Sequence, residues 1–308
     1  MKNNNKEIRQ RVVDQVLELM QQGINPWIQP WQDGNSLGNH NCISGHIYKG
    51  INIPVLTYSK NDNEFVSNQW ITFNQTRKND GKIIKGSKAT KVIFIKKIYF
   101  DKKDEKGNLV YDDEGNKEKI PFSLLRETPI FNIEQTENVQ LPKAETKRMK
   151  DAIAKEDMMK SDKGVKWIDD LYKKLNVSLN YSNETKAFYS SFDDAIQLPF
   201  RSMFKNSSGY VATALHELIH WTGHQSRMDR KLGNGYGSIE YAYEELIAET
   251  GSAIMNSKYG IQGEIENHAS YIKSWINVLK NDPQKLFDAS YQSQQGMEYI
   301  EENGNLSQ

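Results

Sequence analysis

The chain has one cysteine, Cys42, among its 308 residues. A single cysteine excludes an intramolecular disulfide and a cysteine-ligated zinc ion, and it suits a reducing cytoplasm. No apolar run reaches the roughly 18 residues needed to span a bilayer, and residues 1–6 lack the apolar segment of a secretory signal. These absences predict a cytoplasmic protein with no membrane partner, and the length leaves room for two domains.

The sequence also lacks a net charge, but its two halves differ in sign. Residues 1–150 carry 24 Lys and Arg against 18 Asp and Glu, and residues 151–308 carry 16 against 22. From Arg77 to Lys103 there are ten basic residues and two acids, and the basic residues alternate with apolar ones such as Val92 and Phe94. This alternation predicts strands. A basic strand surface bearing aromatics suits a nucleic-acid strand, while a solvated charged face is the alternative.

The candidate nucleic-acid ligands are aromatic and basic side chains of this half. They are Trp27, Trp31, Arg77, Lys78, Lys82, Lys85, Lys88 and Lys91. The three lysines at 82, 85 and 88 surround a predicted turn at Gly81–Gly86, where ammonium groups can reach phosphates. Trp70 lies in an apolar run, and we expect it to pack in the core.

The five residues 216–220 read His-Glu-x-x-His. On a helix, positions i and i+4 share a face, so His216 and His220 can bind one metal ion. Glu217 lies roughly 60° around the helix from His220, which places its carboxylate where a water needs a base. The flanking sequence also predicts a helix. Its buried side would be formed by Val211, Leu215, Leu218 and Thr222. Ser207 or Ser208 would cap its N-terminus, and Gly223 would end it.

A catalytic zinc site with an open position needs a third protein ligand. On a predicted downstream helix, Glu245 and Glu249 are one turn apart. We assign Glu245 as the third ligand and Glu249 as the carboxylate that orients a ligand histidine. Glu244 is the alternative ligand, because one sequence does not fix the helix register. The histidines His224 and His268 are weaker candidates for the same position.

Three further features describe the organisation of the chain. Residues Glu7–Gln22 have helical apolar spacing and stop at Gly23, which predicts an amphipathic helix. Residues Lys103–Lys117 are expected to form a charged hairpin with turns at 106–108 and 114–116. Pro142 interrupts the pattern at Thr136–Lys143, which indicates a linker. We identify no internal repeat.

Two sets of motifs, in order along the chain, resemble one known family. The first set resembles the C-terminal metallopeptidase domain of the ArdC antirestriction family and consists of His216–His224, Arg227, Asp229–Arg230 and Tyr241–Glu249. This family includes TraC-type proteins of conjugative plasmids. Its metallopeptidase domain is similar to zincin and SprT-like peptidases. Residues Pro26–Trp31, Ser44–Asn52, Asn68–Phe73, Gly81–Gly86 and Phe131–Gln135 resemble the single-stranded-DNA-binding domain of this family. The strand-like Ala187–Tyr189, followed by Asp193–Pro199, matches the edge strand along which zincins hold a peptide.

The resemblance implies an α+β protein. It implies a mixed α/β single-stranded-DNA-binding domain at 1–135, a linker at 136–146 and a mainly helical zincin-like metallopeptidase domain with a small sheet at 147–308. The implied function is antirestriction: a bacterial mobile-element protein, active in the cytoplasm or transferred with conjugating DNA, binds single strands and protects incoming DNA.

The implied chemistry is peptide hydrolysis at a Zn²⁺ site, with Mn²⁺ as the alternative ion. The ion would activate a water, and Glu217 would take its proton. Tyr210, Tyr236 and His224 are candidates to stabilise the oxyanion. Two alternatives remain: a metalloprotease directed to DNA-bound proteins, and a single-stranded-DNA-binding module whose zincin domain is catalytically silent. The sequence does not name the protein or peptide substrate.

Overall fold

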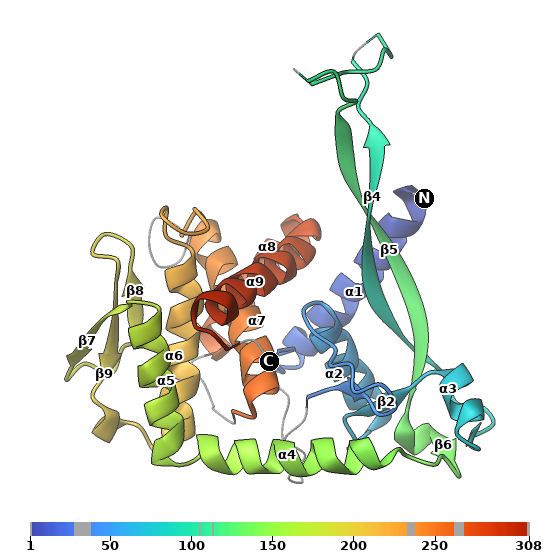
Figure 1. Cartoon of the computed structure of the whole chain (residues 1–308), viewed down its shortest axis with the longest axis horizontal. Helices are drawn as coiled ribbons and strands as arrows, with labels where there is room; N and C mark the ends of the chain where they lie inside the picture. Colours follow the sequence, from blue (N-terminus) through green and yellow to red (C-terminus); the bar gives the residue numbers. More distant parts are fainter. Residues whose placement is uncertain are drawn as a thin grey trace.

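The computed structural model describes residues 2–27, 38–104, 106–112, 114–232, 238–261 and 268–306. Two lobes stand side by side on one long helix, α4 (Lys143–Met159), which runs beneath both of them (Figure 1). The N-terminal lobe combines helices with strands, and helices predominate in the C-terminal lobe. The predicted α+β class is therefore confirmed.

The N-terminal lobe is built on a four-stranded sheet in the order β1-β2-β5-β4. Its elements are α1 (Lys2–Gln21), β1 (His40–Asn41), α2 (Asn52–Asn63), β2 (Gln69–Ile71), α3 (Phe73–Lys78), β3 (Lys82–Ile83), β4 (Thr90–Asp101), β5 (Lys119–Asn132), η1 (Ile133–Gln135) and β6 (Thr136–Glu137). The predicted amphipathic helix is present as α1, although it begins at Lys2, and it buries Val12, Val13 and Val16 completely. It ends before Gly23, whose φ of 76° is unfavourable for other residues.

Strands β4 and β5 continue beyond the sheet as a two-stranded arm (Figure 1). Their pairing runs without interruption from Thr90 opposite Ile130 to Asp101 opposite Lys119. The charged segment at the tip contains the two predicted turns, at Gly107 and Gly115. In each turn an aspartate accepts a 2.8 Å hydrogen bond from the backbone N–H of the asparagine four residues later. The tip therefore repeats one Asp-x-x-Gly-Asn turn, a short repeat that the sequence analysis missed.

The C-terminal lobe surrounds one central helix, α6, with other helices and a three-stranded sheet in the order β7-β9-β8. Its elements are α5 (Asp162–Lys174), β7 (Ser178–Ser182), β8 (Phe188–Ser190), β9 (Ala195–Pro199), η2 (Arg201–Met203), α6 (Ser207–Thr222), α7 (Ile239–Tyr259), α8 (His268–Asn281) and α9 (Gln284–Asn303). Strand β8 is an edge of this sheet and lies against α6. It falls where the sequence predicts an edge strand.

The two lobes share a hydrophobic core. Residues of α1, such as Val12 and Val16, belong to the same buried cluster as Trp275 of α8. The indole of Trp27 packs edge-to-face against that of Trp275, with ring centroids 5.6 Å apart. This contact joins the start of the chain to its last third.

The segment predicted as a linker, 136–146, has regular structure at both ends. Strand β6 pairs with β3, and helix α4 already begins at Lys143. Glu145 on α4 is buried, and its Oε1 atom lies 2.6 Å from Nε2 of His40 and 2.8 Å from Nε2 of Gln69. The connection is therefore packed against the N-terminal lobe, and the division into domains at 135 and 147 stays a prediction. Among the described residues, no helix is long and apolar enough to cross a membrane.

Candidate metal centre and nucleic-acid surface

Helix α6 carries the His-Glu-x-x-His motif at the centre of the C-terminal lobe. Its predicted inner stripe is fully buried at Val211, Leu215, Leu218 and Thr222. The helix stops at Thr222, next to Gly223, as expected. The prediction of its N-cap is wrong. Asn206 accepts a 2.7 Å hydrogen bond from the backbone N–H of Gly209, so Ser207 and Ser208 are already helical.

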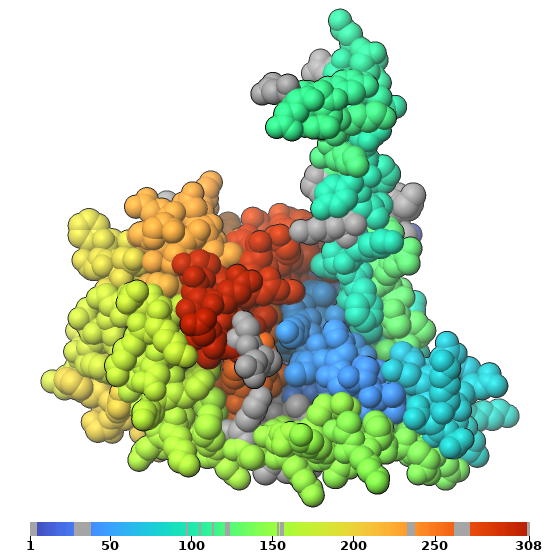
Figure 2. All heavy atoms as spheres, in the orientation of Figure 1, coloured from blue at the N-terminus to red at the C-terminus, as the bar shows by residue number. Residues whose placement is uncertain are grey.

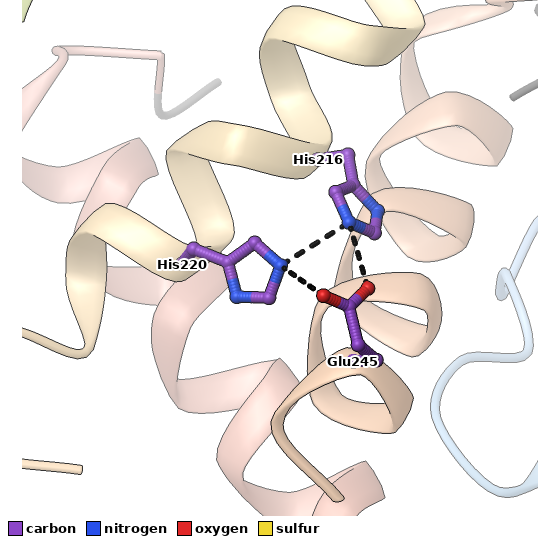
Figure 3. Close-up of side chains that lie close together, drawn as sticks. All are labelled: His216, His220 and Glu245. Atoms are coloured by element: carbon purple, nitrogen blue, oxygen red, sulfur yellow. Dashed lines mark hydrogen bonds and ion pairs between the residues drawn. The ribbon is translucent and has the colours of Figure 1, made fainter. Parts of the chain in front are cut away.

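Three potential ligand atoms converge between α6 and α7 (Figure 3). His216 Nε2 lies 3.2 Å from His220 Nε2 and 3.4 Å from Glu245 Oε2, and His220 Nε2 lies 3.6 Å from Glu245 Oε1. Ligands about 2.1 Å from a tetrahedral zinc ion are separated from each other by roughly 3.4 Å. The three buried side chains therefore have the spacing of zinc ligands.

The neighbouring glutamates of α7 lie on the far edges of the two imidazole rings. Glu249 Oε1 is 3.6 Å from Nδ1 of His216, and Glu244 Oε1 is 3.1 Å from Nδ1 of His220. Consecutive residues of a helix are rotated by roughly 100°, so Glu244 and Glu245 reach opposite edges of the same ring. Each histidine thus has its own carboxylate behind it. Glu244, the alternative third ligand, lies away from the point where the ligand atoms converge.

Glu244 is itself held by an arginine fork. Arg230 donates to both of its carboxylate oxygens, at 3.0 and 2.7 Å, and also to the backbone oxygen of Ile219 and to Thr222 Oγ1. Arg230 therefore connects the end of α6 to α7 directly behind His220. In the sequence, Arg230 belongs to a motif of the family but predicts no role of its own, because an arginine shortly after such a helix is not specific.

Burial and charge together shift the titration of these groups. Burial lowers the pKa of His220, but the carboxylates of Glu245 and Glu244 outweigh it and hold that pKa well above its usual value. Burial raises the pKa of Glu245, yet the two histidines bring it below its usual value. Burial raises the pKa of Glu217. Two imidazoles and one carboxylate form a donor set that fits Zn²⁺ and accepts Mn²⁺.

The edge strand β8 lies beside Glu217 of helix α6. Burial is the larger effect on the Glu217 pKa and raises it, while the backbone N–H of Tyr189 faces the carboxylate and acts to lower that pKa. Near the C-terminal end of α6, hydrogen bonds from Arg227, which we name the Arg227 clamp, fix the position of β8. Arg227 donates to both carboxylate oxygens of Asp194 in the β8–β9 turn, to the hydroxyl of Tyr189 at 3.2 Å and to the backbone oxygen of Trp221 at 2.6 Å. The clamp ties the edge strand to the helix that carries the histidines.

Two further candidates, His224 and Tyr210, have other hydrogen-bond partners. His224 bonds Ser226 Oγ through Nδ1 at 2.8 Å, beyond the end of α6. The hydroxyl of Tyr210 bonds that of Tyr181 at 2.9 Å. His268 is the first residue of α8, and Tyr236 lies outside the described residues. Within the described part of the chain, only His216, His220 and Glu245 form a group with ligand spacing.

The predicted nucleic-acid residues divide into two groups. All six basic ones, Arg77, Lys78, Lys82, Lys85, Lys88 and Lys91, are exposed on the N-terminal lobe. Two of them have acidic partners, since Lys82 lies 2.8 Å from Glu137 and Lys91 lies 3.3 Å from Glu127.

The aromatic candidate that the structure describes, Trp27, does not reach this surface. The indole of Trp27 is 2% exposed, so the prediction that it stacks on a base is wrong: the ring packs on Trp275. Trp31 lies outside the described residues. Trp70 is fully buried, which confirms its predicted place in the core. The local sequence pattern does not predict that α8 covers Trp27, because Trp275 is far from it in the sequence.

The fold and the site together define a zincin-like protein with an added N-terminal lobe, and comparison with known proteins agrees. The profile of a family described as zincin-like metallopeptidase matches residues 166–292, and that of the N-terminal domain of anti-restriction factor ArdC matches residues 6–131. The chain therefore belongs to the ArdC-type antirestriction family.

Solved structures of a relative support this assignment over the whole chain. The metal-free crystal structure of the antirestriction protein ArdC from plasmid R388 has a TM-score of 0.72 and 27% identity, and the match covers 97% of this chain and 98% of that one. The Mn(II)-bound structure gives 0.71 and 25%, over 97% of this chain and 99% of that one.

Among curated proteins, the chain is similar to parts of larger ones. A DNA primase TraC of Escherichia coli is 33% identical over 96% of this chain, and a second is 31% identical over 96%. The chain spans only 20% and 27% of the length of these two relatives. The uncharacterized protein y4eC of Sinorhizobium fredii is 26% identical, over 94% of this chain and 90% of that protein.

Proposed function

We propose that this protein binds single-stranded DNA and protects incoming DNA from restriction, and that its C-terminal lobe is a metal-dependent peptidase. The observation that carries the second part is the convergence of His216, His220 and Glu245 beside Glu217. A site that only stabilised the fold would need no glutamate at position 217, because the three ligands alone can hold an ion.

The residues of the site have separable roles in this proposal. His216, His220 and Glu245 would hold Zn²⁺ or Mn²⁺, and the ion would supply Lewis-acid activation of water and of a peptide carbonyl. Glu217 would accept a proton at its carboxylate and return it to the departing amine. Glu244 and Glu249 would fix the orientation of the two imidazoles through their Nδ1 atoms.

Strand β8 is the proposed guide for the substrate. It is an edge strand, and its Tyr189 N–H reaches Glu217, so a peptide that paired with its outer edge would lie beside the base. The Arg227 clamp would keep the strand at this distance from α6. The substrate class supported best is therefore an extended protein segment.

The N-terminal lobe is the proposed DNA-binding part. Its exposed basic residues at 77–91 form a positive surface suited to phosphates, while residues 151–308 have the opposite charge balance. The relative whose structure matches 97% of this chain is named as an antirestriction protein from a plasmid. We infer that this chain acts on DNA in the cytoplasm of a cell that carries a mobile element.

The test is a cleavage assay on the full-length protein, with and without single-stranded DNA. We expect a metal-loaded sample to cleave a labelled, unfolded protein, and Glu217→Gln to abolish cleavage while metal content stays at the wild-type level. Activation by single-stranded DNA would favour a protease directed to DNA-bound proteins. Absence of cleavage by a sample shown to contain metal would contradict the peptidase and leave a DNA-binding module.

A further inference from the structure

The arm formed by β4 and β5 exposes large apolar side chains to solvent. Phe94, Tyr99, Phe100 and Ile120 are between 42% and 61% exposed. In the view of Figure 2 the arm stands clear of the rest of the surface. Exposed apolar groups gathered in this way commonly mark an interaction site.

The strand register divides these side chains between two faces. Residues directly opposite each other in an antiparallel pair point to the same face. Phe94 lies opposite Arg126, Lys96 opposite Leu124, and Phe100 opposite Ile120, so all six belong to one face, which we name the stacking face. Tyr99 and Lys119 belong to the other face, together with Asp101 and Ile95.

The stacking face carries aromatics and cations without a carboxylate. Between Phe94 and Phe100, and between Ile120 and Arg126, its positions hold no Asp or Glu. Lys96 and Arg126 are exposed, and among the described residues neither has an acidic partner. The opposite face holds Asp101 and Glu127, and Glu127 already pairs with Arg11 and Lys91.

The charge of the arm also changes along its length. The stem, residues 94–101 with 119–126, has four basic residues and one acid, whereas the tip, residues 103–118, has three basic residues and six acids. A polyanion would therefore be attracted to the stem and repelled by the tip.

We propose that the stacking face of the arm binds single-stranded DNA, with bases stacked on Phe94 and Phe100 and phosphates contacted by Lys96 and Arg126. This inference rests on the proposed function and extends the DNA surface from residues 77–91 onto the arm. Alternating aromatic and basic side chains on a β surface bind single strands because every base has a face that can stack. At roughly 3.3 Å per residue, the stem from Phe94 to Phe100 spans about 20 Å, enough for several nucleotides.

A second copy of the chain is the competing occupant. A dimer formed by two stacking faces would bring four cations, Lys96 and Arg126 of each copy, into one interface. Their repulsion would oppose such a dimer, since no carboxylate on this face compensates it. Charge complementarity therefore favours the nucleic acid.

The experiment compares neighbouring residues on opposite faces in the full-length protein. The probe is a fluorescein-labelled oligodeoxythymidylate, and affinity is measured by anisotropy at several salt concentrations. We expect Phe100→Ala to weaken binding about 5- to 150-fold, as the loss of one stacked base does. Tyr99→Ala, which removes a similar exposed ring from the other face, should change affinity less than about twofold by the same reasoning.

Two charge-reversal variants, one on each face, test the phosphate contacts in the same way. Lys96→Glu should reduce the dependence of log Kd on log salt by about 0.7 or more, the contribution of one phosphate contact on a single strand. Lys119→Glu, on the other face, should leave this slope unchanged. These exposed side chains fill no core, so the variants should melt at the wild-type temperature.

Each outcome decides between the explanations. Equal losses in Phe100→Ala and Tyr99→Ala would overturn the assignment of the face. Wild-type affinity in both would show that the arm binds no DNA, while the proposed function would survive. A wild-type protein that binds no single-stranded DNA would refute the proposed function itself. A wild-type dimer that Phe100→Ala dissociates, with DNA affinity unchanged, would assign the face to a second copy.

Discussion

The Oε1 atom of Glu244 lies 3.1 Å from Nδ1 of His220, across the imidazole ring from the Nε2 atom that faces Glu245. When Nδ1 carries the proton and donates to Glu244, the lone pair of Nε2 points toward the proposed metal position. Arg230 holds Glu244 by donating to both of its carboxylate oxygens. The orientation of one proposed ligand, His220, is thus set by a buried charge pair outside the proposed ligand set.

The first prediction distinguishes the glutamates of α7. Glu245→Ala removes one of the three proposed ligands and should lower metal affinity most. Glu244→Ala and Glu249→Ala remove carboxylates proposed to orient the histidines, so they should weaken binding about 10- to 100-fold. The measurement is competition with a chelator of known affinity. Wild-type affinity in Glu245→Ala would transfer the ligand role to another residue.

The second prediction concerns acid stability at the Arg227 clamp. The hydrogen bonds from Arg227 to Asp194 lower the pKa of that carboxyl group. A depressed pKa in the folded state contributes stability that is present above the unfolded value, near 4, and is lost as pH falls through the folded value. Asp194→Asn should therefore lower the melting temperature most at pH 7, and the deficit should shrink below about pH 4. Asparagine tolerates the backbone φ of 48° at this position.

Thermal unfolding across this pH range checks the clamp, with Asp193→Asn as the neighbouring control. That exposed residue bonds only with Ser190 among the described residues. A deficit of Asp194→Asn that did not vary with pH would show that the charge of Asp194 contributes nothing.

The third prediction concerns Cys42. Burial raises the pKa of its thiol to about 12, and the side chain is fully buried. At pH 8 only about one molecule in ten thousand would carry the reactive thiolate. We expect no modification by iodoacetamide in the native protein and complete modification after unfolding in guanidinium. Rapid labelling of the native protein would contradict the burial of Cys42.

The fourth prediction concerns the basic surface of the N-terminal lobe. Replacing Lys82, Lys85 and Lys88 together by Glu should weaken single-stranded-DNA binding by at least tenfold and flatten its salt dependence, because phosphate contacts are lost. The matched control is Lys163, Lys173 and Lys174 replaced by Glu on α5, which gives the same change in net charge on the other lobe. Equal effects of the two triple variants would show that binding follows net charge alone.

The sequence predicts those parts of the site that depend on local spacing. His216 and His220 share a helix face by periodicity, and Glu245 and Glu249 share another. The role of Arg230 and the place of Glu244 behind His220 depend on how α6 and α7 pack. The burial of Trp27 against Trp275 depends on a contact between residues far apart in the sequence. Alternation alone likewise does not show that Val92 and Ile93 are both buried while Phe94 and Ile95 are exposed, because the arm leaves the lobe between them.

Metal content by elemental analysis tests the central claim most directly. Wild-type protein and Glu217→Gln should each carry roughly one zinc or manganese ion per chain, because we propose Glu217 as a base and not as a ligand. His216→Ala and His220→Ala should lose most of it while their secondary structure, followed by circular dichroism, remains. Equal metal content in wild type and His216→Ala, or loss of the metal in Glu217→Gln, would contradict the account.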